Sequence, residues 1–293
     1  MEINDNENAV IGHPESDTPF CADLPTRRQV DIGTVLVTGA SGYIGGRLVP
    51  ELLLRGYRVR AMVRGGAGEI SRRWPGVEVV TADALDRKSL GDALEGVDTA
   101  YYLIHSMLLG PREFAGVDAK AAGYFAAAAA QRGVRRIIYL GGLGDVRSDL
   151  STHLRSRIEV AERLQSGEVP VTILRAAIII GSGSASYEIL ENLVARLPVI
   201  FTPSEARSLC QPISIRDVIK YLVGVMETPI TTGLTFDIGG DEIMTYEEMA
   251  KVVTAVLHKR RFFFHVPFSY LEFYSYLASL LTPVPAPITR CLM

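Results

Sequence analysis

Residues 34–49 read TVLVTGASGYIGGRLV, and this stretch predicts the fold of the whole chain. A short β-branched run, Thr34 to Thr38, is followed by glycines at positions 39, 42 and 45. An apolar pattern with helical period then begins. Strand, tight turn and helix are the context in which a glycine fingerprint indicates dinucleotide binding. The alternative is an ordinary strand-to-helix turn in which the glycines serve packing alone.

Each glycine of this turn has an expected task. Gly39 permits the sharp turn, Gly42 lets the backbone approach a pyrophosphate, and Gly45 lets the helix sit close on the strand. The uncovered N–H groups at the start of the helix, with its positive dipole end, then hold the phosphates. The cofactor contacts expected from the loop are Gly39, Ser41, Gly42, Tyr43, Ile44 and Gly45.

Composition sets the outer limits. With 293 residues and 48% apolar content, the chain can bury the core of one domain and an appended lobe. A net charge of −3 gives no electrostatic reason to expect nucleic acid or an anionic membrane as partner. Cys21, Cys210 and Cys291 are far apart and lack C-x-x-C spacing, which argues against a disulfide framework and a zinc site. These features, and an acidic N-terminus without a signal peptide, predict a cytoplasmic protein.

Strand and helix patterns alternate after the glycine turn, which predicts a Rossmann-type α/β fold with a doubly wound parallel sheet. The expected strands cover residues 57–63, 77–81, 97–104, 136–140 and 171–174, and the main expected helices cover 87–94, 113–132 and 151–165. Three regions are expected. Residues 1–30, polar and without periodicity, form a disordered segment, residues 31–181 form the NAD(P)-binding core, and residues 182–293 form a smaller substrate lobe whose chain returns to the core near 211–240.

Arg64 stands at the end of the second expected strand, 25 residues past Gly39. An acidic residue there would accept hydrogen bonds from the adenine-side ribose of NAD, whereas an arginine suits the extra phosphate of NADP. Arg64 therefore favours NADP as the cofactor, with NAD as the alternative. An ordinary solvated arginine at a strand end is the other interpretation.

The spacing G-x-x-G-x-x-G resembles the short-chain dehydrogenase/reductase superfamily, in its extended and atypical branches. The resemblance implies that Asp83 contacts the adenine amino group. Chain segments at the carboxyl edge of a parallel sheet line the ligand crevice. The cofactor contacts expected there are Asp83, Ala84, Ile104, His105, Ser106, Gly141, Gly142, Arg157 and Ala177. An ordinary loop histidine is the alternative for His105.

Several further segments resemble one atypical branch, the NmrA-like and YbjT-like NAD(P)-binding proteins. They are YYLIHSM at 101–107, HLRSR at 153–157, VPVTILRAAIIIGSGS at 169–184 and LPV at 197–199. The resemblance covers residues 33–290. Members of the branch often carry a further C-terminal domain, so the end at Met293 is expected to be a truncation.

Standard members of the superfamily use a Tyr-x-x-x-Lys pair on the helix after the fifth strand, which lies on one helical face. Here His153 and Arg157 occupy those places, and Gly141 and Gly142 stand where the superfamily has a serine. A guanidinium stays protonated and does not shuttle protons, although it can bind a ribose hydroxyl or a phosphate. An imidazole titrates near neutrality. His153 and Arg157 are therefore the candidate catalytic residues, and a solvent-facing histidine is the alternative for His153.

Two functions remain open. The first is an NADP-dependent oxidoreductase of a small apolar carbonyl, quinone or similar substrate, with an apolar pocket supplied by the aromatic residues of the lobe. The second is a redox sensor or assembly protein that binds NAD(P) without turnover. Residues 262–283 form the most apolar stretch, interrupted by His265, Pro267 and Glu272. A lobe helix over the substrate pocket is the first interpretation of this stretch, and peripheral membrane contact is the second.

Overall fold

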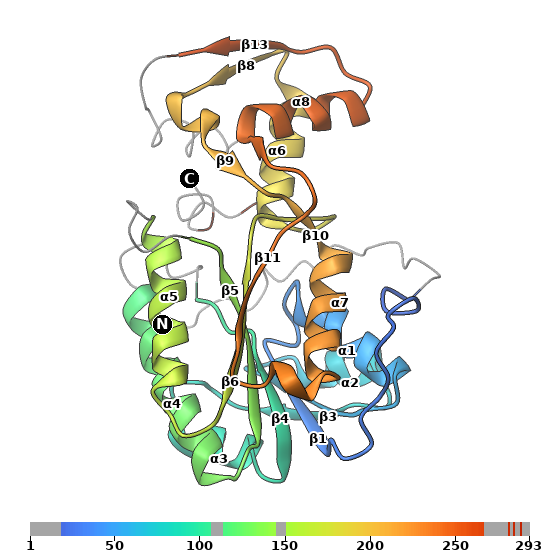
Figure 1. The fold of residues 1–293 in the computed structure, drawn as a ribbon, viewed down its shortest axis with the longest axis vertical. Helices are drawn as coiled ribbons and strands as arrows, with labels where there is room; N and C mark the ends of the chain where they lie inside the picture. The colour runs from blue at the N-terminus through green and yellow to red at the C-terminus, as the bar shows by residue number, and fades with distance from the viewer. Residues whose placement is uncertain are drawn as a thin grey trace.

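The computed structural model describes residues 19–106, 114–144 and 151–266, and the single positions 281, 284 and 288. Its centre is a seven-stranded sheet with the order β11-β6-β5-β4-β1-β2-β3 (Figure 1). The strands are β1 (Thr34–Thr38), β2 (Arg58–Val63), β3 (Glu78–Thr81), β4 (Val97–Tyr102), β5 (Arg136–Gly142), β6 (Val171–Ala176) and β11 (Thr235–Ile238). All neighbouring pairs are parallel. The strand order reverses between β1 and β4, so the predicted doubly wound sheet is confirmed.

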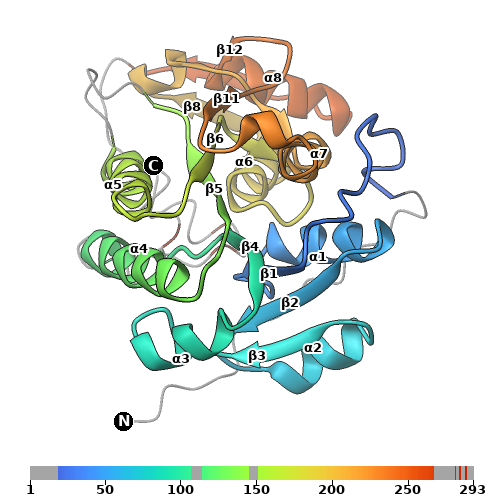
Figure 2. The same ribbon diagram turned by 60° about the horizontal axis from the view of Figure 1, so that its bottom comes forward.

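Helices cover both faces of the sheet (Figure 2). One face carries α1 (Gly45–Leu54), α2 (Ala67–Arg73) and α7 (Ile215–Met226), and the other carries α3 (Arg87–Ala93), α4 (Phe114–Gln131) and α5 (Thr152–Gln165). Within β1, Val35 and Val37 pack into the first core and Leu36 into the second. The strand is therefore apolar without alternation, as a strand buried on both faces must be.

Two strands extend beyond the predicted ends. β5 and β6 continue to Gly142 and Ala176, and their parallel pairing persists through Gly141↔Arg175 and Gly142↔Ala176. The apolar pattern did not predict positions 141 and 142 because glycine has no side chain that marks a buried face, whereas the chain from Arg175 onward was expected to continue β6. β4 is shorter than predicted and ends at Tyr102, where its pairing with β5 also ends.

A smaller lobe lies at one end of the sheet (Figure 1). It contains α6 (Ala185–Arg196), β8 (Val199–Thr202), η2 (Ser204–Arg207), β9 (Leu209–Cys210), β12 (Met244–Thr245), α8 (Tyr246–Val256) and β13 (Phe262–His265). At its base β7 (Ile179–Ile180) pairs with β10 (Ile213–Ser214). The chain returns to the core through α7, the short η3 (Pro229–Thr231) and β11, which pairs with β6.

The apolar stretch at 262–283 does not begin as a helix. Residues 262–265 form β13, which pairs in parallel with β8 and places Phe264 beside Phe201. Three consecutive phenylalanines suit a strand because aromatic side chains pack well on a pleated surface. Residues 267–280 lie outside the described part of the chain. In the described part, no helix combines the length and the hydropathy that crossing a bilayer requires.

The expected disorder of residues 1–30 is wrong for residues 19–30. Cys21 is only 2% exposed and belongs to the core that contains α1 and α7. Its backbone N–H and that of Phe20 donate to the carboxylate of Glu51 at 3.1 Å and 2.6 Å. The segment is irregular, so it shows no periodicity, and its partners are distant in the sequence. Residues 1–18 lie outside the described range.

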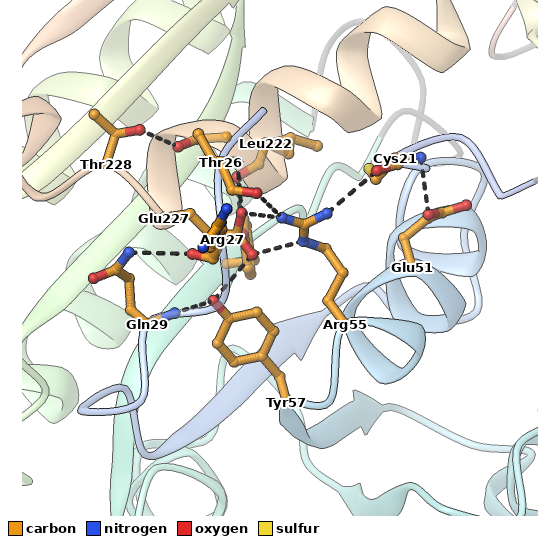
Figure 3. A network of polar contacts seen from close by, with 12 residues as sticks. Cys21, Thr26, Arg27, Gln29, Glu51, Arg55, Tyr57, Leu222, Glu227 and Thr228 are labelled. Atoms are coloured by element: carbon orange, nitrogen blue, oxygen red, sulfur yellow. Dashed lines mark hydrogen bonds and ion pairs between the residues drawn. The ribbon is translucent and has the colours of Figure 1, made fainter. Parts of the chain in front are cut away.

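A buried ion pair fastens this segment to the core (Figure 3). The Arg55 guanidinium donates to both carboxylate oxygens of Glu227, at 2.6 Å and 2.5 Å, and the Glu227 side chain is fully buried. The hydroxyls of Thr26 and Tyr57 donate to the same carboxylate at 2.6 Å and 3.1 Å. The N-terminal segment, the turn between α1 and β2, and the residue that follows α7 therefore meet at one carboxylate.

Candidate functional site

The glycine loop is so tightly folded that side chains would not fit. Gly39 has φ of +61°, and a Cβ there would lie 2.9 Å from the carbonyl oxygen of Leu103. A Cβ on Gly45 would lie 2.4 Å from the carbonyl oxygen of Gly39, and one on Gly42 would lie 3.1 Å from the same atom. The N–H of Gly42 donates to that oxygen at 2.9 Å. The loop therefore needs glycine at positions 39 and 45 to close on itself, and the space beside Gly42 is tighter than an ordinary Cβ contact.

The start of α1 is open. Its N-cap residue, Ile44, offers no side-chain hydrogen bond, and the first turn contains no acidic residue. Among the described residues, nothing accepts a hydrogen bond from the N–H groups of Tyr43 and Ile44. These donors and the helix dipole face the carboxyl edge of β1, where an anionic group would satisfy them.

Arg64 lies at the same edge. It directly follows β2, whose residue Met62 pairs with Thr38, the last residue of β1. Its side chain is exposed, so the charge is available to a ligand. Asp83, two residues past β3, is exposed as well, and its carboxylate accepts the N–H of Leu85 at 2.9 Å.

Arg47 ties the loop to the base of the lobe, a contact that the sequence did not indicate. Its guanidinium donates to the carbonyl oxygens of Tyr43 at 3.0 Å and Ser182 at 2.8 Å, and lies 4.2 Å from the centre of the Tyr43 ring. Burial raises the pKa of Tyr43 to about 12. A phenol with so high a pKa stays neutral at physiological pH.

A cluster of two histidines and an aspartate lies beyond the end of β4. Nδ1 of His105 is 2.7 Å from Oδ2 of Asp118, and Nε2 of His105 is 3.2 Å from Nδ1 of His153. The N–H of Ser106 donates to Oδ1 of Asp118 at 3.0 Å. The cluster joins three segments: the chain after β4, α4 and α5. Asp118 is 1% exposed, so its carboxylate depends on these donors.

Burial sets the protonation of both imidazoles. It lowers the pKa of His105, although the hydrogen bond to Asp118 acts in the opposite direction. It lowers the pKa of His153 to about 3, with further contributions from His105 and the Arg157 guanidinium. Both rings are therefore neutral at pH 7.

Arg157 follows His153 by one helical turn, as the sequence indicated. Its guanidinium donates to the carbonyl oxygen of Leu140 and lies 5.1 Å from the centre of the Tyr139 ring. One of its terminal nitrogens is buried without a partner among the described residues. A Cβ on Gly142 would lie 2.8 Å from Cδ2 of Leu154. The Leu154 side chain of α5 therefore occupies the space that a serine side chain at position 142 would need.

Comparison with known proteins decides the family. The sequence profile of the NmrA-like family matches residues 31–285 of the chain. The protein belongs to the NmrA-like family. The resemblance expected from the sequence is thereby confirmed, and family membership together with the open glycine loop supports a nicotinamide dinucleotide as the cofactor.

Among curated relatives, the chain is 36% identical over 116 residues to sterol demethylase protein B of Methylococcus capsulatus. The aligned region covers 39% of this chain and 35% of that relative. The chain is 28% identical over 200 residues to the ceramide reductase of Caulobacter vibrioides, which covers 68% of this chain and 62% of the relative. The matches thus span between about a third and three fifths of those relatives.

Solved structures show the same fold. A nucleoside-diphosphate-sugar epimerase from Staphylococcus aureus superposes with a TM-score of 0.72 at 18% identity and covers 88% of both chains. Triphenylmethane reductase from Citrobacter sp., solved with NADP(H), superposes with a TM-score of 0.70 at 22% identity and covers 88% of this chain and 86% of its own. At such identities the likeness is one of fold alone.

In this NmrA-like protein the predicted residues fall into two groups. The loop residues and Arg64 gather at the carboxyl edge of β1 and β2, whereas His105, Ser106 and His153 gather around Asp118. The other predicted contacts, Ala84, Ile104, Gly141 and Ala177, follow or end other strands of the sheet. Sequence reasoning missed Asp118. It is the one acidic residue between positions 114 and 131, but the sequence does not show that it lies beside the two histidines.

Proposed function

We propose that this protein is an NADP(H)-dependent oxidoreductase. The observation that carries the proposal is the open N-terminus of α1, with sterically required glycines at positions 39 and 45, at the point where the strand order reverses. Dinucleotides bind at such switch points because the helix N-terminus and the loop N–H groups accommodate a pyrophosphate. A turn that only connected β1 to α1 would have no need for uncapped donors at this edge.

Arg64 supports NADP over NAD. The exposed guanidinium stands one residue past β2, at the edge where the adenine-side ribose of a bound dinucleotide lies in this fold. Planar guanidinium groups bind phosphate through paired hydrogen bonds, and a carboxylate at this position would repel the 2′-phosphate. We therefore assign Arg64 to the 2′-phosphate, and Asp83 to the adenine.

An apolar carbonyl, quinone or similar compound is the proposed substrate. The names of the relatives refer to a sterol, a ceramide and a triphenylmethane, all apolar molecules. The lobe above the sheet carries exposed aromatic side chains, including Phe201 and Phe264 with ring centres 6.3 Å apart. An apolar substrate gains free energy from such surface when water is displaced.

The chain's own contribution is placement and proton transfer. A bound nicotinamide supplies or accepts hydride. The glycine loop and Arg64 hold the two ends of the adenine-side half of the cofactor. His153 stands where the superfamily has its tyrosine, and its neutral imidazole can exchange a proton with a substrate oxygen.

A redox sensor that binds NAD(P) without turnover is the second candidate. The observation that favours it is the contact of Arg157, whose guanidinium donates a hydrogen bond to the carbonyl oxygen of Leu140. Arg157 therefore does not assist proton transfer as the lysine of the superfamily does. Substitution of His153 by alanine separates the two functions. An oxidoreductase loses turnover in this variant, whereas a sensor retains its affinity for the cofactor.

A thermal-shift comparison tests the cofactor assignment. NADPH at a concentration 100 times its Kd should stabilise the protein by about 2.7 kcal/mol, because it binds only the folded state. NADH should give a smaller shift, and Arg64→Ala should remove the difference between the two. Arg58→Ala, which removes an exposed arginine at the opposite end of β2, is the matched control. Equal shifts with NADH and NADPH in the wild type would refute the role of Arg64.

A further inference from the structure

The hydrogen bonds among Asp118, His105 and His153 have a defined direction, which the resemblance to the superfamily does not imply. We propose that these three residues form a directional proton relay, in which His153 is the catalytic residue and His105 and Asp118 are positioning residues. The proposal rests on the proposed oxidoreductase function and deepens it. It is carried by the hydrogen-bond geometry of one carboxylate and two imidazoles on three different segments.

Asp118 fixes the first link. A carboxylate is an acceptor only, and its two oxygens accept from different donors. Oδ1 receives the backbone N–H of Ser106 at 3.0 Å, and Oδ2 faces Nδ1 of His105 at 2.7 Å. Nδ1 of His105 must therefore carry a proton. Because a neutral imidazole carries one proton, Nε2 of His105 is an acceptor.

The second link follows from the first. Nε2 of His105 lies 3.2 Å from Nδ1 of His153, so Nδ1 of His153 donates. Nε2 of His153 is then an acceptor, and it makes no hydrogen bond with a described residue. In this row of three residues, Asp118, His105 and His153, every shared proton points towards Asp118. The row therefore ends in an unprotonated ring nitrogen on α5, at the position where the superfamily has its catalytic tyrosine.

The chemical step balances in both directions. When a substrate hydroxyl is oxidised, its O–H bond breaks and the proton passes to Nε2 of His153, while the C–H electron pair leaves as hydride to an oxidised nicotinamide. His153 then gives its Nδ1 proton to Nε2 of His105, which becomes an imidazolium beside Asp118. In reduction the same protons move in the opposite direction, and the substrate oxygen receives one proton and the carbon one hydride.

Charged groups around the row act in opposite directions on its protonation. Asp118 on α4 is the negative charge beside His105, and Arg157 on α5 is the positive charge near both rings. The buried phenols of Tyr102 and Tyr139 stay neutral because burial raises their pKa values. Burial and the Arg157 guanidinium keep both rings neutral at pH 7, so the reductive reaction needs the row to be protonated first. Reductive turnover should rise as the pH falls below 7.

Nitrogen NMR of the protein without cofactor tests the order of the row. With five histidines in the chain, a long-range ¹H–¹⁵N spectrum of histidine-labelled protein can be assigned with His105→Gln and His153→Gln. Both His105 and His153 should carry their proton on Nδ1 at pH 7. In Asp118→Asn the side-chain amide can donate to Nδ1 of His105, which should shift the protons of both rings to Nε2. Glu69→Gln, which removes an exposed carboxylate from α2, is the control and should leave both rings unchanged.

A row with protons on Nε2 in the wild type, or an unchanged His153 ring in Asp118→Asn, would overturn the relay. A purely structural cluster would lose stability in Asp118→Asn but would not couple the His153 tautomer to residue 118. This test does not involve the cofactor. If NADPH failed to bind, the proposed function would fall while the spectra still decided the order of the row.

Kinetics supply the second test, with menadione and NADPH as the probe reaction. Asp118→Asn should lower kcat about 10²–10⁴-fold, the range typical for a lost proton-transfer group. It should also remove the rise in kcat at low pH and leave the Kd for NADPH within threefold. An unchanged kcat and pH profile in Asp118→Asn would refute the relay. A wild-type protein without turnover would count against the proposed function instead.

Discussion

Gly45 and Gly46 are adjacent in α1, yet the structure assigns them opposite responses to alanine. A Cβ on Gly45 would lie 2.4 Å from the carbonyl oxygen of Gly39 and 2.8 Å from Cα of Ala40. Both neighbours are backbone atoms that cannot turn aside. The nearest atom to a Cβ on Gly46 is the carbonyl oxygen of Ala40 at 3.7 Å, which is an ordinary contact. Gly46→Ala is thus a matched control for Gly45→Ala.

The magnitudes follow from two terms. Alanine in place of glycine stabilises a helix by up to about 1 kcal/mol, and both variants share this gain. Gly45→Ala also carries the steric cost of an atom forced into a closed loop, typically about 1–3 kcal/mol. We expect Gly46→Ala to be slightly more stable than the wild type, and Gly45→Ala to be less stable than Gly46→Ala by about 1–3 kcal/mol.

Urea unfolding followed by tryptophan fluorescence measures this difference, since the chain has one tryptophan, Trp74, which is buried beside α2. A parallel titration with NADPH should show weaker binding to Gly45→Ala, because the loop must open to admit the methyl group. Gly46→Ala should bind as the wild type does. Equal stability and equal affinity in the two variants would refute the close approach of α1 to β1.

Three further predictions concern the ion pair, the histidine and the arginine. Arg55→Met leaves the buried Glu227 carboxylate without its cation and should lower the free energy of unfolding in urea by about 3–5 kcal/mol. Arg163→Met, which breaks an exposed pair with Glu159, should lower it by less than about 0.5 kcal/mol. Similar losses in the two variants would refute the stabilising role of the Arg55–Glu227 pair. Because the folded pKa of His153 is about 3, below the unfolded value of 6.5, the unfolded state binds more protons between these values, and stability should fall as the pH drops from 6.5, by up to about 1.4 kcal/mol per unit. His153→Asn should flatten that slope, and an unchanged slope would place the imidazole in water. Arg64→Glu should weaken NADPH binding at least tenfold more than NADH binding, and direct titration with both nucleotides checks this.

The sequence predicted those features that depend on local pattern. The positive φ of Gly39 and the contacts of Gly42 and Gly45 with residues 39 and 40 are local, so the loop and the fold could be predicted together, although the contact of Gly39 with Leu103 could not. The capping residues of the helices are similarly local: Ser151 accepts the N–H of Leu154 at the start of α5, and Thr245 with Glu248 forms a capping box. Parallel pairing then follows from the alternation of strands and helices.

Features that depend on distant partners could not be predicted in the same way. Asp118 has meaning only beside His105 and His153, and nothing in the spacing of these residues places them together. Residues 19–30 are held by Glu51 and by Glu227, which is 201 residues from its partner Thr26. An irregular segment with distant partners has the same sequence pattern as a disordered one.

The central claim is that the loop of residues 39–45 binds the pyrophosphate of a nicotinamide dinucleotide. Isothermal titration of the protein with NADPH tests it most directly, with Gly45→Ala as the variant in which the loop is distorted. The account predicts saturable binding of one NADPH per chain with a Kd between about 1 μM and 1 mM, the range typical of KM values of enzymes, and a clearly weaker Kd in the variant. The absence of saturable binding to the wild type, or the same Kd in both proteins, would contradict it.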